Sequence, residues 1–393
     1  MISNKQLTIL LVAPQPFFQD RGTPIAVRLL SEALAEEGHN VHLLVYHEGK
    51  DIEMEGVTLH RIPNVPLVKG IRPGMSFKKL ICDLFIFYKM IRLSRALSFD
   101  LIHAVEEAVF LAQFLKLFTK TPYIYDMDSS MSGQIIDKQP VLKKLEGPLE
   151  SFEKSAIRGS AGVIAVCRAL EDTARRLSPN TPIVRLEDIS LLDANKQGEE
   201  ILRDHYNISG LLLLYVGNLE SYQGIDLLLE SFSKAYGSGI NGHLVIIGGT
   251  TDNIEKYKFL SEQLTITSRV HFIGPRPMDT LGYYLAQADI LVSPRTQGNN
   301  TPMKIYSYLA SGKAVLATRL STHTQVLNDK VACLVAPDSE AMAKGIEQLC
   351  EDSSLRGCLG NAGKELASSE YSLPAFKQKL SSFYYTISIG SDI

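Results

Sequence analysis

The stretch from Ala288 to Thr318 constrains the fold of this chain more than any other. It reads ADILVSPRTQGNNTPMKIYSYLASGKAVLAT. Residues 290–292 have the unbroken apolar character of a buried strand, and a loop of turn-forming residues follows. Thr301 is placed to cap a helix with Pro302 at its first position; the helix ends at Gly312, before a second apolar strand at 314–317. A strand, loop, helix and strand within about 30 residues make a βαβ unit of a parallel sheet.

Lys304 carries a charge that disagrees with its predicted position. It lies in the first turn of this helix, where the macrodipole is already positive, at a cost of roughly a few tenths of a kcal/mol. A bound anion would reverse the sign, because free N–H groups and Lys304 would converge on it, with Arg295 in the same loop. The alternative is that Lys304 bends into solvent. The surrounding sequence favours the anion.

The bulk numbers describe an ordinary globular protein. At 393 residues, two domains are the expectation, and 45% hydrophobic residues, 21% charged residues and a net charge of −3 give no reason to expect a nucleic-acid partner. The five cysteines form no C-x-x-C pair, which indicates a reducing compartment rather than a disulfide framework or a zinc site. We expect no signal peptide and no membrane span, and therefore a cytoplasmic location.

The amino-terminal half repeats the pattern of strand, loop and helix. Apolar strands are predicted at 8–13 and 41–46, with a helix starting near Thr23 between them. A short strand leads to His103 and Glu106, and another, at 123–125, leads to Asp126 and Asp128. Strand ends are where such sheets bind ligands. Simple capping and hydrogen bonding at the strand ends is the alternative for each of these four side chains.

The carboxyl-terminal half continues in the same way. A strand at 211–216 is followed by Gly217 and Asn218, and Gln223 opens the next helix. The strand and glycine turn at 243–249 include Gly248, where a nucleotide could approach the backbone closely. The strand at 270–274 precedes Arg276. A polar, irregular segment at about 185–200 is the expected linker between the two halves.

The run Ser-Pro, Gly, then Pro-x-Lys-Ile-Tyr-x-Tyr-Leu-Ala-x-Gly-Lys-x-Val resembles the nucleotide-sugar loop of family 4 glycosyltransferases. The resemblance covers almost the whole chain. It implies the α/β GT-B fold, in which two doubly wound Rossmann-like domains with parallel sheets face a cleft. The implied domains are 1–190 for the acceptor and 200–370 for the nucleotide sugar, with a last helix in 371–393 that packs back on the first domain.

The resemblance also assigns residues. Gly22 and Thr23 are implied to approach the donor phosphates or the acceptor, and Asp128 stands where the family usually has a histidine near the acceptor hydroxyl. We take Asp128, His103, Lys304 and Arg295 as catalytic candidates. The expected substrate-binding residues are Gly22, Thr23, Glu106, Asp126, Gly217, Asn218, Gln223, Gly248, Arg276, Asn299, Asn300, Thr301 and Ser307.

The sequence departs from the family pattern at four of these positions. Asn218 and Gln223 replace an arginine and a lysine that neutralise the leaving diphosphate, and Asn299 and Ser307 replace a pair of glutamates. We expect Arg276, Arg295 and Lys304 to restore the positive charge. The chain is accordingly either a divergent enzyme or a domain that has lost catalysis, and the retained glycine turns and cations favour the enzyme.

Residues 76–97 are predicted to form one long helix with a basic stripe. At 100° per residue Lys78, Lys89 and Arg92 share one side, together with Phe85. Such a face suits an anionic membrane, at the inner face of the plasma membrane if the protein is cytoplasmic. A solvated surface helix is the alternative.

These expectations combine into a retaining, metal-independent transfer of a hexosyl-type sugar from a nucleotide diphosphate sugar to a glycan or lipid-linked acceptor. No metal or other cofactor is expected. Retention and metal independence come from the resemblance alone. Two alternatives stay open: a nucleotide-sugar epimerase or hydrolase of the same fold, and a catalytically silent nucleotide-sugar-binding partner subunit.

Overall fold

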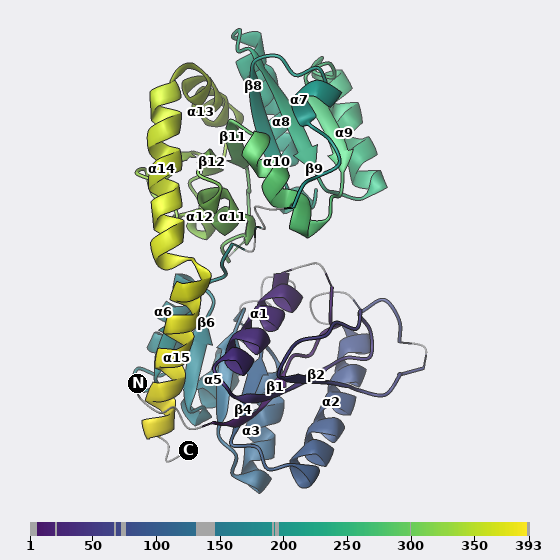
Figure 1. Cartoon of the computed structure of the whole chain (residues 1–393), viewed down its shortest axis with the longest axis vertical. Coiled ribbons are helices and arrows are strands. Elements are labelled where there is room, and N and C mark those ends of the chain that lie inside the picture. The colour runs from purple at the N-terminus through teal and green to yellow at the C-terminus, as the bar shows by residue number, and fades with distance from the viewer. Residues whose placement is uncertain are drawn as a thin grey trace. The chain divides into compact units, whose positions relative to one another are not determined.

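The computed structural model describes residues 6–19, 22–66, 68–71, 76–130, 146–190, 192, 196–298 and 300–390. The chain divides into two compact units (Figure 1). The first unit comprises Met1–Glu187 and Lys377–Ile393, and the second comprises Asp188–Phe376. Each unit is built around one sheet.

The first unit contains a seven-stranded sheet in the order β3-β2-β1-β4-β5-β6-β7, and every pair of neighbouring strands is parallel. Its strands are β1 (Thr8–Val12), β2 (Asn40–Val45), β3 (Val57–Arg61), β4 (Leu101–Val105), β5 (Tyr123–Met127), β6 (Gly162–Ala165) and β7 (Ile183–Arg185). Its helices are α1 (Gly22–Glu36), α2 (Phe77–Ala96), α3 (Ala108–Thr119), α5 (Glu146–Gly159), α6 (Arg168–Leu177) and most of α15 (Leu373–Gly390).

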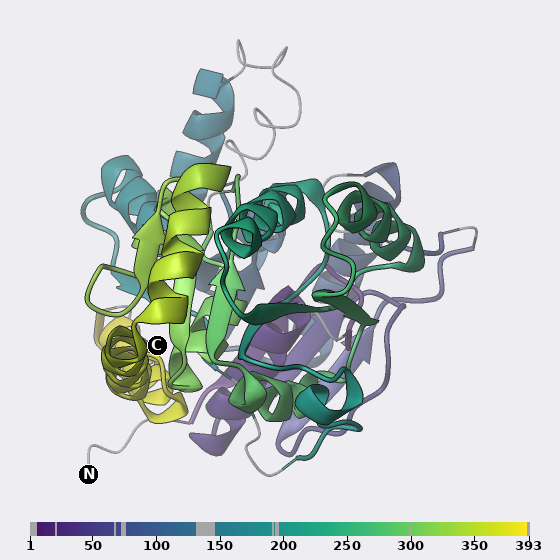
Figure 2. The same cartoon turned by 90° about the horizontal axis from the view of Figure 1, so that it is seen from above.

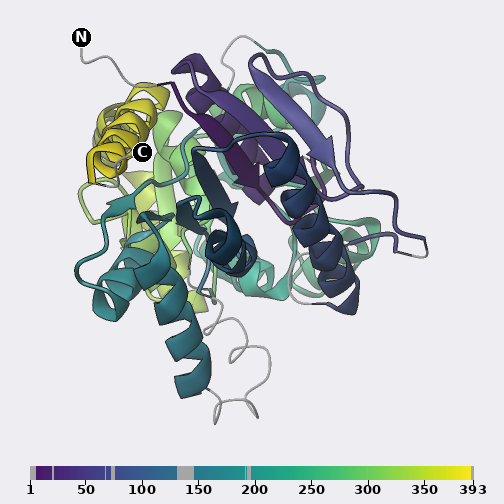
Figure 3. The same ribbon diagram turned by 90° about the horizontal axis from the view of Figure 1, so that it is seen from below.

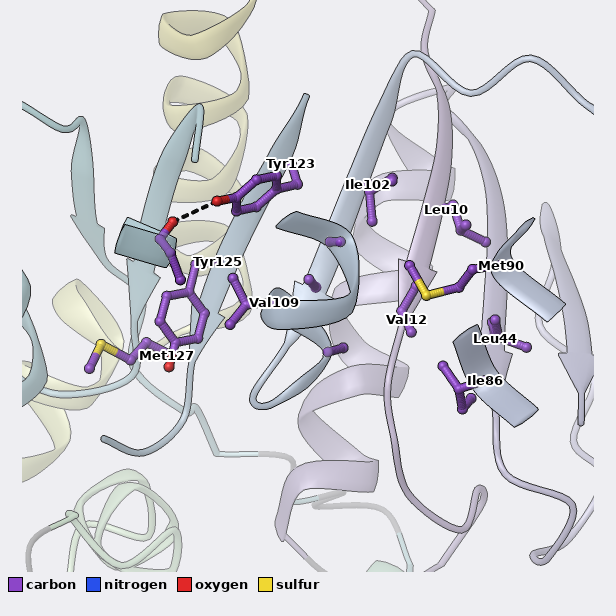
Figure 4. Close-up of a cluster of buried hydrophobic side chains, with 14 of the residues drawn as sticks. Leu10, Val12, Leu44, Ile86, Met90, Ile102, Val109, Tyr123, Tyr125 and Met127 are labelled. Carbon is purple, nitrogen blue, oxygen red and sulfur yellow. Dashed lines mark hydrogen bonds between the residues drawn. The ribbon is translucent and has the colours of Figure 1, made fainter. Parts of the chain in front are cut away.

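The five inner strands are almost wholly buried because helices cover both faces of the sheet, whereas the edge strands β3 and β7 are only partly buried. One face of β1 and β4 packs against α2 and α3, as the close-up of Leu10, Ile102, Ile86 and Val109 shows (Figure 4). Helices α2, α3 and α5 lie side by side on this face (Figure 3). The apolar continuity of each strand therefore reflects burial on two sides.

The second unit contains a six-stranded parallel sheet in the order β10-β9-β8-β11-β12-β13. Its strands are β8 (Leu211–Val216), β9 (Gly242–Ile247), β10 (Val270–Gly274), β11 (Ile290–Ser293), β12 (Ala314–Thr318) and β13 (Cys333–Val335). Its helices are α7 (Leu202–His205), η2 (Ser221–Gln223), α8 (Ile225–Gly237), α9 (Thr251–Gln263), η3 (Met278–Thr280), α10 (Leu281–Gln287), α11 (Lys304–Ala310), α12 (Ser321–Thr324), α13 (Ser339–Glu351) and α14 (Ser353–Glu370).

Helices cover both faces of this second sheet as well (Figure 2). Helices α10 and α11 contribute to the apolar cluster on one face, and α8, α9 and α13 contribute to the cluster on the other. Both units are therefore doubly wound α/β domains, as the sequence predicts. In each sheet the strand order reverses between the first strand and the fourth, and the carboxyl ends of strands beside such a point are the usual place for a ligand.

Two predicted strands are longer than expected, and this changes the position of their polar residues. Strand β4 extends to Val105 and β5 to Met127, so His103 and Asp126 lie inside strands and not beyond them. The predicted helix at 76–97 is confirmed as α2, and Ser76 caps it by accepting a hydrogen bond from the Lys79 amide.

Candidate active site

The point of strand reversal in the second sheet lies between β8 and β11. Strand β8 ends at Val216 and is followed by Gly217, and β11 ends at Ser293 and is followed by the loop that carries Arg295. Helix α11 begins at Lys304. The sheet topology thus brings three of the predicted site residues to one edge.

Lys304 is held in place by three neighbours. Its ammonium lies 3.9 Å from the centroid of the Tyr215 ring, a cation–π distance, and donates a hydrogen bond of 3.2 Å to Oε1 of Gln223. A Cβ on Gly217 would lie 2.9 Å from Nζ, so the glycine makes room for the ammonium. Lys304 thus brings an ammonium beside Gln223, the position where the resemblance implies a lysine.

Arg295 folds its own loop around its guanidinium. Nε donates to the carbonyl of Gln297 at 2.8 Å and Nη1 to the carbonyl of Asn300 at 2.9 Å. The guanidinium also lies 5.2 Å from the centroid of the Tyr222 ring. These contacts hold the guanidinium near enough to Lys304 for its charge to lower the pKa of that ammonium, and no carboxylate of the described residues compensates it.

Two cations with no acidic partner are unfavourable in a partly buried place. Among the described residues, neither Lys304 nor Arg295 forms an ion pair with a carboxylate. Burial, and then the charge of Arg295, hold the pKa of Lys304 well below its usual range. A bound anion would remove this penalty, so we call Lys304, Arg295 and Thr301 the candidate anion site, in short the anion site.

The hydroxyl of Thr301 does not have the role that the sequence predicts for it. The prediction that it caps α11 is wrong: the residue before the helix is Met303, and no side chain caps the helix start. The loop enters the helix through short turns instead, since the Ile305 amide donates to the Pro302 carbonyl. The Thr301 hydroxyl is buried and has no hydrogen-bond partner among the described residues, so it can bind a ligand oxygen.

The glycine turn beside the anion site is sterically required. Gly217 has φ of 148° and Gly248 has φ of 111°, and a Cβ on Gly248 would lie 2.1 Å from the Gly217 carbonyl oxygen. The ends of β8 and β9 approach each other this closely because neither residue has a side chain.

The other predicted residues of this unit are distributed unevenly. Asn218 lies at the edge, where its Nδ2 is 3.4 Å from the Tyr222 hydroxyl, and Ser307 lies one turn after Lys304 on α11. Asn300 contributes its carbonyl to Arg295, and Asn299 lies outside the described residues.

Arg276 does not supplement the charge of the anion site. Its Nη2 forms an ion pair of 2.6 Å with Glu200, and Nη1 donates to the Ile273 carbonyl. The expectation that it restores charge for a diphosphate is wrong, because Glu200 already neutralises it. Arg276 instead fastens the segment that enters the second unit.

In the first unit, His103 and Asp126 form a structural contact. His103 is fully buried and its Nε2 lies 3.1 Å from Asp126, while Nδ1 lies 2.6 Å from the hydroxyl of Tyr384 in α15. The Asp126 carboxylate can only accept, so Nε2–H donates to it, and Nδ1 is left to accept from the Tyr384 hydroxyl. Burial raises the pKa of Tyr384 well above its usual range, so this hydroxyl keeps its proton. Both ring nitrogens of His103 are hydrogen-bonded inside the first unit, where they connect β4 to β5 and to α15. The catalytic role of His103 and the substrate-binding role of Asp126 stay predictions.

The carboxyl edge of the first sheet carries a partly paired group of charges. Glu107 follows β4 and forms an ion pair with Lys79 of α2. Burial lowers the pKa of Lys79, but the charges of Glu107 and Glu106 outweigh it and raise that pKa. Asp83 accepts a hydrogen bond from Tyr46, and burial raises the pKa of its carboxyl to about 6.

Glu106 adopts an unusual backbone conformation at this edge, with φ of 51°. A glutamate in the left-handed region costs free energy, and such residues are often found at functional sites. Its amide donates to the Asp126 carbonyl, which fixes the turn after β4. Asp128 is partly buried just after β5, and Ser130 donates to the buried Glu153 at 2.9 Å. Gly22 and Thr23 lie in the first turn of α1.

Two aromatic residues of the anion site escaped the sequence analysis. Tyr215 lies inside the apolar run of β8, where it is one more large buried side chain, and Tyr222 lies in the short η2 helix. Both support cations, and both stand within eight residues of Gly217. The only available signal was an aromatic residue on each side of a glycine turn.

Helices α2 and α3 present an exposed apolar surface, which we call the α2–α3 surface. Phe77 and Leu117 are 77% and 72% exposed. The two helices meet through the rings of Phe87 and Phe114, whose centroids are 5.5 Å apart. The exposed members are Phe77, Leu80, Leu84, Tyr88, Phe114, Leu117 and Phe118.

The basic stripe on α2 differs from its prediction. Lys78 and Arg92 are exposed beside the apolar residues, but Phe85 packs against the core and Lys79 is paired with Glu107. In the described part of the chain, no helix combines the length and the apolar character needed to cross a bilayer.

Two family models together match most of the chain. The model of glycosyltransferase family 4 matches residues 21–186, and the model of glycosyl transferases group 1 matches residues 200–366. The capsular polysaccharide biosynthesis glycosyltransferase CapM of Staphylococcus aureus is 26% identical over 203 residues, 50% of each chain. The phosphatidyl-myo-inositol mannosyltransferase of Mycolicibacterium smegmatis is 22% identical over 88% of this chain and 85% of that protein. In its match to CapM, the chain spans about half of that relative's length.

Solved structures resemble the whole chain. A sucrose-phosphate synthase of Thermosynechococcus elongatus has a TM-score of 0.76 at 21% identity, covering 98% of this chain and 100% of that one. The Anabaena protein HepE in complex with UDP-glucose has a TM-score of 0.72 at 15% identity, covering 97% of this chain and 100% of that one. At such identities the likeness establishes the fold, which is GT-B. With both halves matched by the family models and both units folded in this way, the chain belongs to the family 4, group 1 glycosyltransferases.

Proposed function

We propose that this protein transfers a hexosyl-type sugar from a nucleoside diphosphate sugar to a glycan or lipid-linked acceptor, with retention of configuration and without a metal ion. The observation that carries the proposal is the anion site at the strand reversal of the second sheet. Lys304 and Arg295 provide two positive charges, and a nucleoside diphosphate sugar carries two negative charges on its phosphates. The Thr301 hydroxyl is available to a third oxygen.

The chemistry needs charge stabilisation at the leaving group. When the bond between the sugar carbon and the diphosphate oxygen breaks, its electron pair stays on the diphosphate, and Lys304 and Arg295 stabilise that charge. Fixed cations in a partly buried site perform this task well because they need little reorganisation. Because no metal ion takes part in this proposal, these two side chains alone compensate the charge of the leaving diphosphate. Retention follows from the family 4 resemblance.

The donor is supported by the solved structures of HepE, which were determined with UDP, with UDP and glucose, and with UDP-glucose. We take a uracil nucleotide as the first donor to test. Sugars and acceptors named for the relatives, such as the mannosyl group and phosphatidyl-myo-inositol, are further choices.

The acceptor is assigned to the carboxyl edge of the first sheet. Asp128 and Glu106 stand at the ends of adjacent strands there, and their carboxylates can accept hydrogen bonds from sugar hydroxyls. The acceptor proton passes to a departing phosphate oxygen in this proposal, so Asp128 orients the hydroxyl and need not remove its proton. The strained backbone of Glu106 supports a role in binding.

A lipid-linked acceptor agrees with the α2–α3 surface. Exposed phenylalanine and leucine side chains lie beside Lys78, Lys89 and Arg92. This combination suits a bilayer, which has anionic headgroups at its surface and apolar chains beneath them. The proposal therefore includes peripheral contact with the cytoplasmic face of the plasma membrane.

The experiment is a thermal-shift screen of the full chain with nucleotides and nucleotide sugars, followed by turnover assays with the stabilising donors. We expect stabilisation by a nucleoside diphosphate and by one or more of its sugars, and transfer to a lipid-linked acceptor. Stabilisation by none of them would contradict the proposal. Binding without any turnover would identify a silent partner subunit, and donor hydrolysis without transfer would identify a hydrolase.

A further inference from the structure

His323 lies directly behind the anion site and takes no part in the function proposed above. It belongs to the short helix α12, which follows β12, and its side chain is fully buried. Burial is the largest cause of a pKa of about 4 for this imidazole; the Thr318 carbonyl opposes the shift, and the charges of Lys304 and Arg295 add to it. The ring is neutral at physiological pH.

The neighbours of His323 select one tautomer. Nδ1 lies 2.8 Å from the carbonyl oxygen of Thr318, which can only accept, so Nδ1 carries the proton. Nε2 is then an acceptor, and the hydroxyl of Ser293 lies 2.9 Å from it. The neutral ring therefore joins the last residue of β11 to the last residue of β12.

The connection extends to the loop that carries the cations. The hydroxyl of Thr318 donates to the carbonyl of Arg295 at 2.5 Å. This bond holds the first residues of the loop, and the guanidinium of Arg295 holds the remainder through the carbonyls of Gln297 and Asn300. The loop leads directly to Thr301 and Lys304.

We propose that His323 is a positioning residue for the anion site: as a neutral donor–acceptor it joins Ser293 to Thr318, and through Thr318 it fixes the Arg295 backbone and hence the placement of both cations. The inference rests on the proposed function only in naming the anion as a diphosphate. A buried hydroxyl and a buried carbonyl would lose their partner without the ring, and supporting contacts of this kind fix the geometry of a site.

The first experiment measures the affinity of the full chain for inorganic pyrophosphate, which needs the anion site and neither base nor sugar. His323→Leu removes both hydrogen bonds of the ring, and we expect the affinity to fall about tenfold or more. His323→Asn keeps a donor for the Thr318 carbonyl and should recover most of that loss. His205→Leu makes the same change at an exposed histidine of the same unit and should have no effect.

A second pair of variants keeps the test valid if His323→Leu does not fold. Thr318→Val removes the hydroxyl that holds Arg295 with little change of shape, and Thr318→Ser keeps it. We expect a large loss of affinity with valine and recovery with serine. Equal pyrophosphate affinity in the parent and in His323→Leu, or in Thr318→Val if that leucine variant does not fold, would overturn the proposal.

A spectroscopic readout tests the tautomer directly. In ¹⁵N-histidine-labelled protein, the resonances lost in His323→Asn should show a protonated Nδ1 and an unprotonated Nε2 between pH 6 and 8. The opposite tautomer would overturn the assignment. Pyrophosphate binding that depends on His323, in a protein with no turnover of any nucleotide sugar, would uphold this inference and reject the proposed function.

Discussion

Without a bound anion, the positive charge of Lys304 is unfavourable, because the side chain is buried beside Arg295. Burial and Arg295 lower its pKa, so between that lowered pKa and the ordinary value of 10.5 the folded chain holds fewer protons than the unfolded chain. The free energy of unfolding should therefore rise with pH in that window. A bound diphosphate would reverse this by favouring the ammonium.

The first prediction is that diphosphate binding takes up protons. At about pH 8.5 the terminal phosphate of a nucleoside diphosphate, with a pKa of about 6, is fully ionised, so proton uptake reports on the protein. Calorimetry of UDP binding in two buffers with different ionisation enthalpies should show net uptake in the parent. In Lys304→Met the uptake should disappear and the affinity should fall much more than the melting temperature. Unchanged affinity in this variant would refute the anion site.

The second prediction concerns Gly217. Gly217→Ala should weaken pyrophosphate binding about tenfold or more, because its Cβ would displace the Lys304 ammonium from 2.9 Å and a good charge-assisted hydrogen bond contributes on this scale. Gly239 is the control: its φ is also positive, at 101°, but a Cβ there meets nothing within 4 Å. Gly239→Ala should lower stability by about 1 kcal/mol and leave affinity unchanged. Equal affinities in the two variants would contradict the steric argument.

The third prediction concerns Asp128. If it orients the acceptor hydroxyl, Asp128→Asn should lower turnover with acceptor by roughly 10²-fold or more, the scale of losing a group that handles the reacting proton. Donor affinity should stay nearly unchanged, since the anion site belongs to the second unit. Full transfer activity in the variant would reduce Asp128 to a strand-end residue.

Helix α2 illustrates how far periodicity predicts an element. The helix follows from the sequence, but the side chains it exposes do not. The segment before α2 contributes Val65, Val68 and Ile71 to the same core cluster, and Lys78 donates to the Lys69 carbonyl. Phe85 packs against this cluster as well, so it is partly buried. A helical wheel gives the angular position of each side chain, but the neighbouring elements of the fold determine which of those side chains are buried.

The fourth prediction is that α2 binds anionic vesicles through charge and apolar contact together. Reversing Lys78, Lys89 and Arg92 to Glu should abolish sedimentation with vesicles that contain phosphatidylserine, and high salt should weaken it in the parent. Replacing Leu80, Leu84 and Tyr88 by Ser should also abolish it, at unchanged net charge.

The matched control for the fourth prediction lies in the second unit. Lys258, Lys344 and Lys364 are exposed, and their reversal to Glu changes the net charge equally. Binding by this control and loss in the α2 variant would locate the contact. A parent that ignores anionic vesicles would show that the α2–α3 surface serves another purpose.

In the loop of the anion site, likewise, some features could be predicted from the sequence and others could not. Lys304 and Arg295 could be found because a lysine at a helix start contradicts the macrodipole, and such local contradictions are visible in a sequence. The sequence does not show that the start of α11 lacks a side-chain cap. The choice between a capped start and short turns depends on the hydrogen bonds of Arg295 to the carbonyls of its loop. The full burial of His103 could not be predicted, because β4 continues to Val105 and so places His103 inside the strand.

At the scale of the whole molecule, the first unit is discontinuous in sequence. Helix α15 returns to it, and Tyr384 donates to His103 in its interior. Phe383 and Ile387 also pack so closely that a Cβ on Gly162 would lie 2.6 Å and 3.1 Å from them. The second unit is therefore an insertion between Glu187 and Lys377.

The fifth prediction follows from that insertion. A chain of residues 188–376 alone should fold and bind pyrophosphate with the affinity of the parent. Deleting 377–393 from the full chain should lower the melting temperature of the first unit alone, because the buried His103 loses the hydroxyl of Tyr384 as its partner. Joining Glu187 to Lys377 through a short glycine linker should restore it, since Lys379 lies 3.0 Å from Glu187. Failure of 188–376 to fold would show that the units depend on each other.

The returning helix also has a consequence for biosynthesis. A ribosome delivers the second unit complete before it delivers α15, so the unit that comes later in the sequence can finish folding first, against the usual amino-terminal order. The first unit must wait, with His103 and the Gly162 side of its sheet uncovered, until α15 leaves the exit tunnel. Protease pulses on stalled nascent chains should find the second unit resistant while the first is still cleaved. Chaperone binding, if it occurs, should concentrate on the nascent first unit in that interval.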